Sequence, residues 1–302
     1  MDQAAFIWLD GAIVPWQQAT IHVMSHTLHY GSGAFEGIRC YATDQGPAIF
    51  RLSEHVDRLL KSFSCFGVTV PWDKTTLEQA IIDTIKANNF SDCYIRPILF
   101  LGPESLLLSP RNLSVHCAII ALKMNKYLGK GAINVGISTV RRINPDAVPI
   151  ESKINGCYIN SIFAYHQIKD RGFDEALLLD HHGTVAEGSV ANIFFVINGK
   201  LKTPPLAAIL PGITRASIMT IAQKLGIIVE EQAITLNDIK DATEAFFTGT
   251  ASEITPIAKI EDKIFLGAPG PVTQQLVAHY QAITHGTDED CKSWLTFINK
   301  NR

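Results

Sequence analysis

The sequence contains few charged residues and no long hydrophobic run. Asp, Glu, Lys and Arg make up 18% of the 302 residues, and the net charge is −3 at pH 7. This balance excludes a highly charged disordered chain and gives no overall attraction to nucleic acid or an anionic membrane. No apolar stretch approaches the roughly 18 residues of a membrane-spanning helix. The start, Met1-Asp2-Gln3, lacks the basic and apolar segments of a signal peptide. We therefore expect a cytoplasmic protein.

Cysteine is also scarce, and no Cys-x-x-Cys pair occurs. Most of the cysteines stand beside apolar residues, which predicts buried side chains in a reducing compartment rather than a disulfide framework. The six are Cys40, Cys65, Cys93, Cys117, Cys157 and Cys291.

The length and the apolar content predict two well-packed domains. Apolar residues make up 47% of the chain, and a domain typically has about 150 residues. The stretch 125–132 is polar and contains glycine, so we expect it to be the interdomain linker. It would join a smaller N-terminal α/β domain, 1–124, to a larger C-terminal domain, 133–302.

Hydrophobic periodicity predicts helices and strands in both halves. Asp10-Gly11 predicts a hairpin turn within 6–16, Ser53 an N-cap, and Pro97 an edge strand or a bulge. Strands and helices mix without strict βαβ alternation, so we predict an α+β fold. Helices are expected from Ser53 to Gly67 and at 76–88, 159–169, 214–225 and 272–283, and strands at 94–101, 115–122, 133–140, 175–179, 193–197, 227–232 and 245–248.

Two patterns resemble ligand motifs but are better explained as structure. The glycines from Gly31 to Gly37 are one residue too widely spaced for a dinucleotide-binding loop, and they follow no apolar strand. His22, His26 and His29 have helical spacing, but no carboxylate or cysteine stands near them at ligand spacing. We therefore expect turn glycines and no metal.

Two turns have the features of an anion site. Leu210 to Arg215 opens a helix, where free N–H groups and the helix dipole favour phosphate. Thr248 to Ser252 leaves an apolar strand as a turn of small residues, which can also direct N–H groups at an anion. Taken alone, each turn is explained by ordinary capping or turn chemistry, whereas the two together favour a phosphate site as much as they favour that explanation.

Three charged residues have both a functional and an ordinary interpretation. Lys153 lies among apolar and small residues that would lower its pKa towards that of a nucleophilic amine, although a lone lysine is usually a surface charge. Glu187, before an apolar strand, could pair with a buried cationic ring nitrogen or could be a turn carboxylate. Arg58 could face solvent from its helix.

Several segments, in order, resemble the class IV aminotransferases, the fold-type IV pyridoxal-phosphate enzymes, and are most similar to the branched-chain amino acid aminotransferases. The resemblance covers nearly the whole chain and implies a two-domain fold like that of D-amino acid aminotransferase. The motifs are His22-Val-Met-Ser-His-Thr-Leu-His-Tyr30-Gly, Phe35-Glu-Gly-Ile-Arg-Cys-Tyr41, Tyr94-Ile-Arg96-Pro, Leu210-Pro-Gly-Ile-Thr214-Arg and Gly249-Thr-Ala-Ser-Glu-Ile-Thr-Pro256.

The resemblance implies pyridoxal 5′-phosphate as the cofactor and assigns its ligands. Lys153 would form the Schiff base and carry the proton, and Glu187 would pair with the pyridine nitrogen, which makes the ring an electron sink. Tyr158 would lie beside the 3′-oxygen. The phosphate would be bound by Arg58, Ile213, Thr214 and Thr250.

The resemblance also implies how one site accepts both leucine-like and glutamate substrates. Tyr94 and the backbone of Thr250 and Ala251 would bind the α-carboxylate. The second carboxylate of glutamate would be bound by Arg96, Tyr30 and Tyr127. Apolar side chains would contact Phe35, Tyr30, Tyr158 and Tyr127.

The activity implied is ping-pong transamination of leucine, isoleucine and valine with 2-oxoglutarate, by a homodimer or a dimer-based oligomer such as a hexamer. The alternatives are a D-amino-acid or other class IV aminotransferase, an aminodeoxychorismate lyase, and a pseudoenzyme. Arg111-Asn112-Leu113 lacks the histidine of the D-specific Arg-x-His pair. Leu107, Met124-Asn125-Lys126 and Ser189-Val190-Ala191 depart from the family pattern near the pocket, so specificity is less constrained than chemistry.

Overall fold

The computed structural model describes residues 4–123 and 131–298. The chain divides into two compact units. The first unit comprises Met1–Asn125, Ser152–Gly156 and Ala282–Arg302, and the second comprises Lys126–Glu151 and Cys157–Gln281. The α+β fold predicted from the sequence is confirmed, because sheets with parallel and antiparallel pairs occur together with helices. Part of the predicted linker, 124–130, lies outside the described residues.

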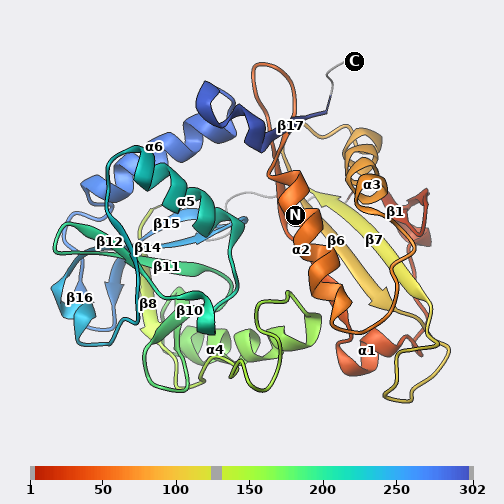
Figure 1. The fold of residues 1–302 in the computed structure, drawn as a ribbon, viewed down its shortest axis with the longest axis horizontal. Coiled ribbons are helices and arrows are strands. Elements are labelled where there is room, and N and C mark those ends of the chain that lie inside the picture. Colours follow the sequence, from red (N-terminus) through yellow and green to blue (C-terminus); the bar gives the residue numbers. More distant parts are fainter. Residues whose placement is uncertain (1–3, 124–130, 299–302) are drawn as a thin grey trace. The chain divides into compact units, whose positions relative to one another are not determined.

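The first unit is an eight-stranded sheet with two helices packed on it (Figure 1). The strand order is β17-β5-β4-β6-β7-β1-β2, and β3 also pairs with β6. Helices α2 and α3 bury Val56, Leu59, Phe63, Leu77 and Ile81 against the sheet. The strands are β1 (Phe6–Leu9), β2 (Ala12–Pro15), β3 (Gly33–Phe35), β4 (Ile38–Tyr41), β5 (Ala48–Phe50), β6 (Cys93–Leu101), β7 (Val115–Leu122) and β17 (Leu295–Phe297), and the helices are α1 (His26–Tyr30), α2 (Leu52–Ser64) and α3 (Lys74–Ala87).

Two local predictions in this unit are wrong. Pro97 lies in the middle of β6, in the interior of the sheet. Its carbonyl accepts a hydrogen bond from the Glu36 N–H at 2.9 Å. The side of the strand on which proline lacks an N–H therefore faces residues 36–37, which separate β3 from β4. Ser53 is not the N-cap of α2. Arg51 takes that position, because its backbone N–H bonds the Trp294 carbonyl and its side chain bonds Glu54.

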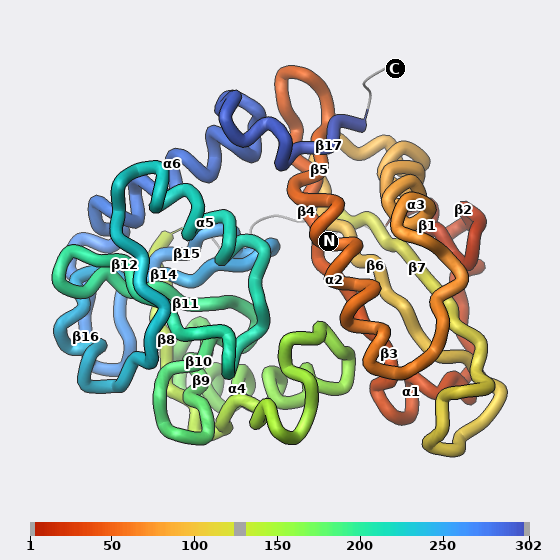
Figure 2. Tube along the Cα trace, viewed as in Figure 1, coloured from red at the N-terminus to blue at the C-terminus, as the bar shows by residue number. Residues whose placement is uncertain are grey.

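The second unit is built on a mixed nine-stranded sheet (Figure 2). The order is β10-β9-β8-β15-β14-β11-β12-β13, and β16 pairs with β15. Helix α4 packs against β9 and α5 against β14. The strands are β8 (Ile133–Ile137), β9 (Glu175–Leu179), β10 (Val185–Gly188), β11 (Asn192–Ile197), β12 (Lys200–Thr203), β13 (Val229–Glu231), β14 (Ala242–Gly249), β15 (Glu253–Ile260) and β16 (Lys263–Ile264), and the helices are α4 (Tyr158–Asp170), α5 (Ile213–Lys224) and α6 (Pro271–Thr284).

The two units do not follow the predicted boundary at every point. The sequence places all of 133–302 in one domain, whereas Ser152–Gly156 and Ala282–Arg302 belong to the first unit. The first of these segments is bound there by backbone hydrogen bonds of Lys153 with Ser62 and Phe35. The second segment contains β17, which pairs with β5. Both attachments join residues distant in sequence, so local periodicity does not reveal them.

Candidate active site

Lys153 is fixed in the first unit by its backbone. Its N–H donates to the Ser62 hydroxyl at 2.9 Å, and its carbonyl accepts from the Phe35 N–H at 3.1 Å. The side-chain amine lies 4.9 Å from the centroid of the Phe35 ring. The lysine is half-buried. A strand end and a helix hydroxyl therefore position a lysine amine over an aromatic ring.

Arg96 stacks on the same ring. Its guanidinium carbon lies 4.6 Å from the Phe35 centroid and 5.3 Å from that of Tyr94. Tyr94 and Arg96 are two residues apart in β6 and so share one face of the sheet, and an Arg96 Nη donates to the Tyr94 hydroxyl at 2.8 Å. The buried Nε of Arg96 has no hydrogen-bond partner among the described residues. A buried donor normally has an acceptor, so this position suits a carboxylate.

Arg58 belongs to a buried charge cluster that the sequence analysis did not identify. Its Nε and Nη2 donate to the two carboxylate oxygens of Glu36 at 2.6 and 2.8 Å, and His55 Nδ1 lies 2.7 Å from the same carboxylate. Glu36 is fully buried and His55 is 1% exposed. The sequence contains one usable signal, because His55 and Arg58 are three residues apart on one helix and therefore share a face.

The cluster has a defined protonation state. Burial raises the pKa of Glu36, but Arg58 and His55 outweigh burial and hold this pKa far below its usual range. Burial is the largest single influence on the pKa of His55 and lowers it. Glu36 raises this pKa and Arg58 and Lys153 lower it, and the net result is a pKa below the usual value. At neutral pH the cluster therefore contains ionised Glu36, cationic Arg58 and neutral His55, which donates its Nδ1–H.

In the second unit, Glu187 is a buried carboxylate surrounded by donors. Arg142 Nε donates at 2.6 Å, Asn192 Nδ2 at 3.0 Å and the Leu210 N–H at 3.3 Å. The side chain of Glu187 is 7% exposed. Arg142 was not identified from the sequence, because it lies in a polar connection 45 residues from Glu187. These donors fix the orientation of the carboxylate.

The two predicted anion-binding turns are present in this unit. Gly212 is the N-cap of α5, and a Cβ there would lie 1.9 Å from Asn192 Oδ1, so a larger residue would displace the Asn192 side chain that binds Glu187. No acidic residue occupies the first turn of α5. Near the end of β14, just before the second turn, the buried Thr248 hydroxyl has no hydrogen-bond partner within the described residues. Both turns fit a phosphate group.

The remaining predicted residues are distributed between the units. Tyr30 ends α1 and is 46% exposed. Tyr158 begins α4, Ile213 and Thr214 begin α5, and Thr250 and Ala251 form the turn between β14 and β15. Tyr127 lies outside the described residues. The structure thus brings Lys153, Phe35, Tyr94 and Arg96 together in the first unit and places the Glu187 cluster, α5 and the β14–β15 turn in the second.

No group of three His, Cys, Asp or Glu side chains in residues 4–123 and 131–298 has metal-binding geometry. In the same ranges, no helix is both long and apolar enough to cross a membrane.

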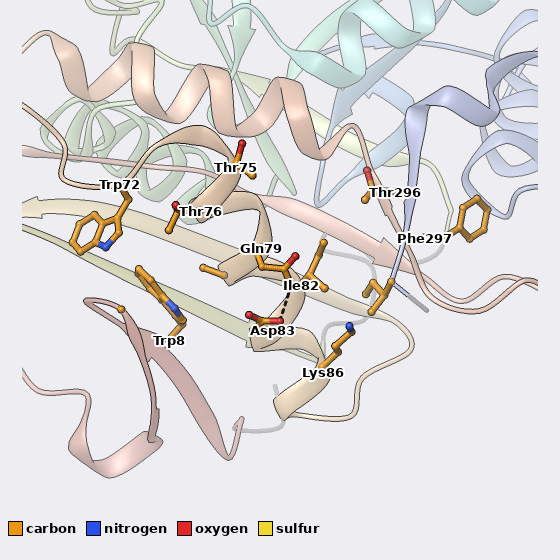
Figure 3. A pocket seen from close by; sticks show the side chains of 13 residues that line it. Trp8, Trp72, Thr75, Thr76, Gln79, Ile82, Asp83, Lys86, Thr296 and Phe297 are labelled. Atoms are coloured by element: carbon orange, nitrogen blue, oxygen red, sulfur yellow. Dashed lines mark hydrogen bonds between the residues drawn. The ribbon is translucent and has the colours of Figure 1, made fainter. Parts of the chain in front are cut away.

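A separate groove of about 1170 Å³ lies elsewhere in the first unit (Figure 3). Trp8 and Trp72 meet edge to face at one side, with ring centroids 5.6 Å apart. On α3, Gln79 donates to Asp83 at 2.8 Å. None of the residues predicted to bind cofactor or substrate lines this groove, so the candidate site is a different one.

Residues 33–260 match the sequence profile of the class IV aminotransferases. This match covers most of the chain, and the chain therefore belongs to that family, as its motifs predict. It is 41% identical to a branched-chain-amino-acid aminotransferase from Pseudomonas aeruginosa, over 98% of both chains. Among solved structures, it resembles the branched-chain aminotransferase from Thermoproteus uzoniensis determined with norvaline (TM-score 0.95, 40% identity, 98% of this chain and 99% of that one). It also resembles the Thermobaculum terrenum enzyme in its PLP form (TM-score 0.93, 32% identity, 99% and 100%).

Proposed function

We propose that this protein is a pyridoxal-phosphate-dependent aminotransferase that converts leucine, isoleucine and valine with 2-oxoglutarate into the branched 2-oxo acids and L-glutamate. The observation that carries the proposal is the pair of cations on the Phe35 ring. One is the Lys153 amine and the other is the Arg96 guanidinium. A transaminase of these substrates requires an amine that moves a proton and a cation that binds a carboxylate.

The residues present fit the cofactor. The carboxylate of Glu187, held by Arg142 and Asn192, would accept a hydrogen bond from the N–H of a pyridinium ring and so keep that nitrogen protonated. The Gly212 start of α5 and the turn containing Thr250 fit the phosphate, and Ile213, Thr214 and Arg58 complete its proposed ligands. Tyr158 would donate to the ring oxygen. When bound, pyridoxal phosphate supplies an electron sink that stabilises negative charge at the substrate Cα.

Lys153 would bind the cofactor and then act as the acid–base group. As the family resemblance implies, its amine would take the proton from Cα of the substrate and deliver it to C4′ of the cofactor. The backbone hydrogen bonds to Ser62 and Phe35 restrict where the amine can reach. We infer that they direct Nζ at one face of the substrate.

The substrate side chain would meet both apolar and cationic groups. Phe35, Tyr30 and Tyr158, with Tyr127 outside the described residues, would contact a branched aliphatic chain. Arg96 offers its unpartnered Nε to the second carboxylate of glutamate. Tyr94 and the backbone at Thr250 and Ala251 would bind the α-carboxylate. A site with an apolar wall and one cation accepts both kinds of side chain.

We also propose that the protein forms a homodimer or a dimer-based oligomer. Apolar side chains of the first unit are strongly exposed in residues 21–30 and in the loop that follows β6: Val23 is 71% exposed, Leu28 61%, Leu107 75% and Leu108 79%. Adjacent exposed apolar groups of this kind are typical of a protein interface. The six free cysteines agree with the cytoplasmic location expected from the sequence.

The direct test is a turnover assay of the purified holoenzyme with L-leucine and 2-oxoglutarate, in which glutamate is measured. D-Leucine in a parallel assay separates the L-specific enzyme from the D-amino-acid alternative. We expect glutamate formation with L-leucine only. Turnover confined to D-amino acids would transfer the assignment to the D-specific branch of the family.

A further inference from the structure

Four polar side chains form a chain of hydrogen bonds at the base of the loop between β6 and β7. Asp10 Oδ2 lies 2.6 Å from His116 Nδ1, and His116 Nε2 lies 2.8 Å from the Ser114 hydroxyl. That hydroxyl donates to Glu104 at 2.5 Å. We name these four residues the loop clasp, because Glu104 and Ser114 stand at the two ends of the loop.

His116 links the two carboxylates of the loop clasp. Its Nδ1 lies beside Asp10 and its Nε2 beside the Ser114 hydroxyl, which donates its one proton to Glu104. Burial raises the pKa of Glu104, but the bonds from Ser114 and the charge of His116 outweigh it and hold this pKa below its usual value.

The loop clasp occupies space that only a glycine leaves open. A Cβ on Gly102 would lie 2.1 Å from the Ser114 hydroxyl, 2.8 Å from Glu104 Oε2 and 2.9 Å from His116 Nε2. The Gly102 N–H donates to the Ser114 carbonyl at 2.9 Å. The two ends of the loop are thus joined by both backbone and side chains.

The closed loop reaches α1 through two backbone carbonyls. The Tyr30 hydroxyl donates to the Leu106 carbonyl at 2.9 Å, and His26 Nε2 lies 3.1 Å from the Leu107 carbonyl. A tyrosine hydroxyl has a single proton. While that proton is hydrogen-bonded to the Leu106 carbonyl, the Tyr30 oxygen can offer only its lone pairs to any other group.

We propose that the loop clasp sets the substrate preference by holding the Leu106 carbonyl on Tyr30. This inference rests on the proposed function, in which Tyr30 contacts the substrate side chain. A leucine side chain needs no proton from Tyr30, whereas the second carboxylate of glutamate does and is repelled by the lone pairs. Glutamate must therefore break the bond between Tyr30 and Leu106, and leucine need not.

The test replaces Ser114 by alanine, which removes both central bonds of the loop clasp. The matched control is Ser109→Ala, in the same loop but outside the loop clasp. In the holoenzyme we expect the ratio of kcat/KM for L-glutamate to kcat/KM for L-leucine to rise about 3- to 10-fold in Ser114→Ala, mainly through a lower KM for glutamate, and to stay constant in the control. This is the fold-change expected from one neutral hydrogen bond. Glu104→Gln, which keeps the shape of the side chain, should raise the ratio in the same direction.

Hydrogen exchange of the backbone amides in 103–113 reports the loop clasp without using activity. We expect faster exchange in Ser114→Ala than in Ser109→Ala. Faster exchange with an unchanged or lower substrate ratio would overturn the role in specificity, and unchanged exchange would overturn the loop clasp itself. In a Tyr30→Phe background, Ser114→Ala should no longer change the ratio, and a persisting change would contradict the link to Tyr30. Failure of the wild type to transaminate either substrate would refute the proposed function, but the exchange result would still stand.

Discussion

Replacing Glu36 by glutamine should strongly destabilise the protein although the two side chains have nearly the same shape. The carboxylate is fully buried and accepts from Arg58 twice, at 2.6 and 2.8 Å, and from His55 at 2.7 Å. In glutamine an N–H₂ group replaces one of the two oxygens, and this group cannot accept a hydrogen bond from Arg58 or His55. The substitution also leaves Arg58 without a counter-charge. Breaking a buried pair on one side costs roughly 3–5 kcal/mol, and about 1 kcal/mol lowers Tm by roughly 2–4 °C in a protein of this size class. We therefore expect Tm to fall by roughly 6–20 °C.

The assay is thermal unfolding at saturating pyridoxal phosphate, with Glu54→Gln as the control. Glu54 lies on α2, the helix that carries His55 and Arg58. It pairs with Arg51 but is 43% exposed, so its loss should cost at most about 1 kcal/mol. The folded pKa of Glu36 lies below the unfolded value of about 4.3. Its contribution is thus present above that pH and is lost as the pH falls towards the folded pKa. The gap between wild type and variant should shrink below about pH 4. A variant as stable as the control at pH 7 would refute this reasoning.

Four further variants test the account. Lys153→Ala should lower turnover by at least about 100-fold and leave the circular dichroism spectrum unchanged, because the proton carrier is lost; substantial residual turnover would contradict its role. Arg96→Ala should reduce kcat/KM for glutamate roughly 10- to 100-fold more than for leucine, since only glutamate has a second carboxylate, and equal losses would assign Arg96 another role. Glu187→Gln should reduce kcat by about 100-fold or more, measured at saturating cofactor; a normal kcat would exclude its pairing with the pyridine nitrogen. Stability of the wild type should fall as pH drops below about 6.5, because buried His55 binds protons less readily than in the unfolded chain, and His55→Gln should lack that fall in urea unfolding.

Local features of the fold could be predicted because they depend on neighbouring residues. The turn at Asp10-Gly11 has positive φ at both residues, and the helix of the second unit predicted to stop at Gly226 ends at Lys224. Pro97 was misassigned because the interruption that tolerates it is formed by residues 36–37 on another segment. Such a feature has no trace in the local pattern.

The candidate site could be predicted only where residue type and motif carried the information. Lys153 and Glu187 were recognisable as reactive types, and the motifs supplied their roles. Glu36 and Arg142 were missed, because their importance arises from pairing with Arg58 and Glu187, which lie 22 and 45 residues away. Charge pairing between distant segments is a property of the folded chain.

The most direct test of the central claim is the visible absorption spectrum of the purified holoenzyme before and after addition of L-leucine. We expect the visible band of bound pyridoxal phosphate to disappear with L-leucine and to return when 2-oxoglutarate is added. We expect Lys153→Ala not to complete this cycle. A visible band that L-leucine leaves unchanged, in wild-type protein fully loaded with cofactor, would contradict the proposed reaction.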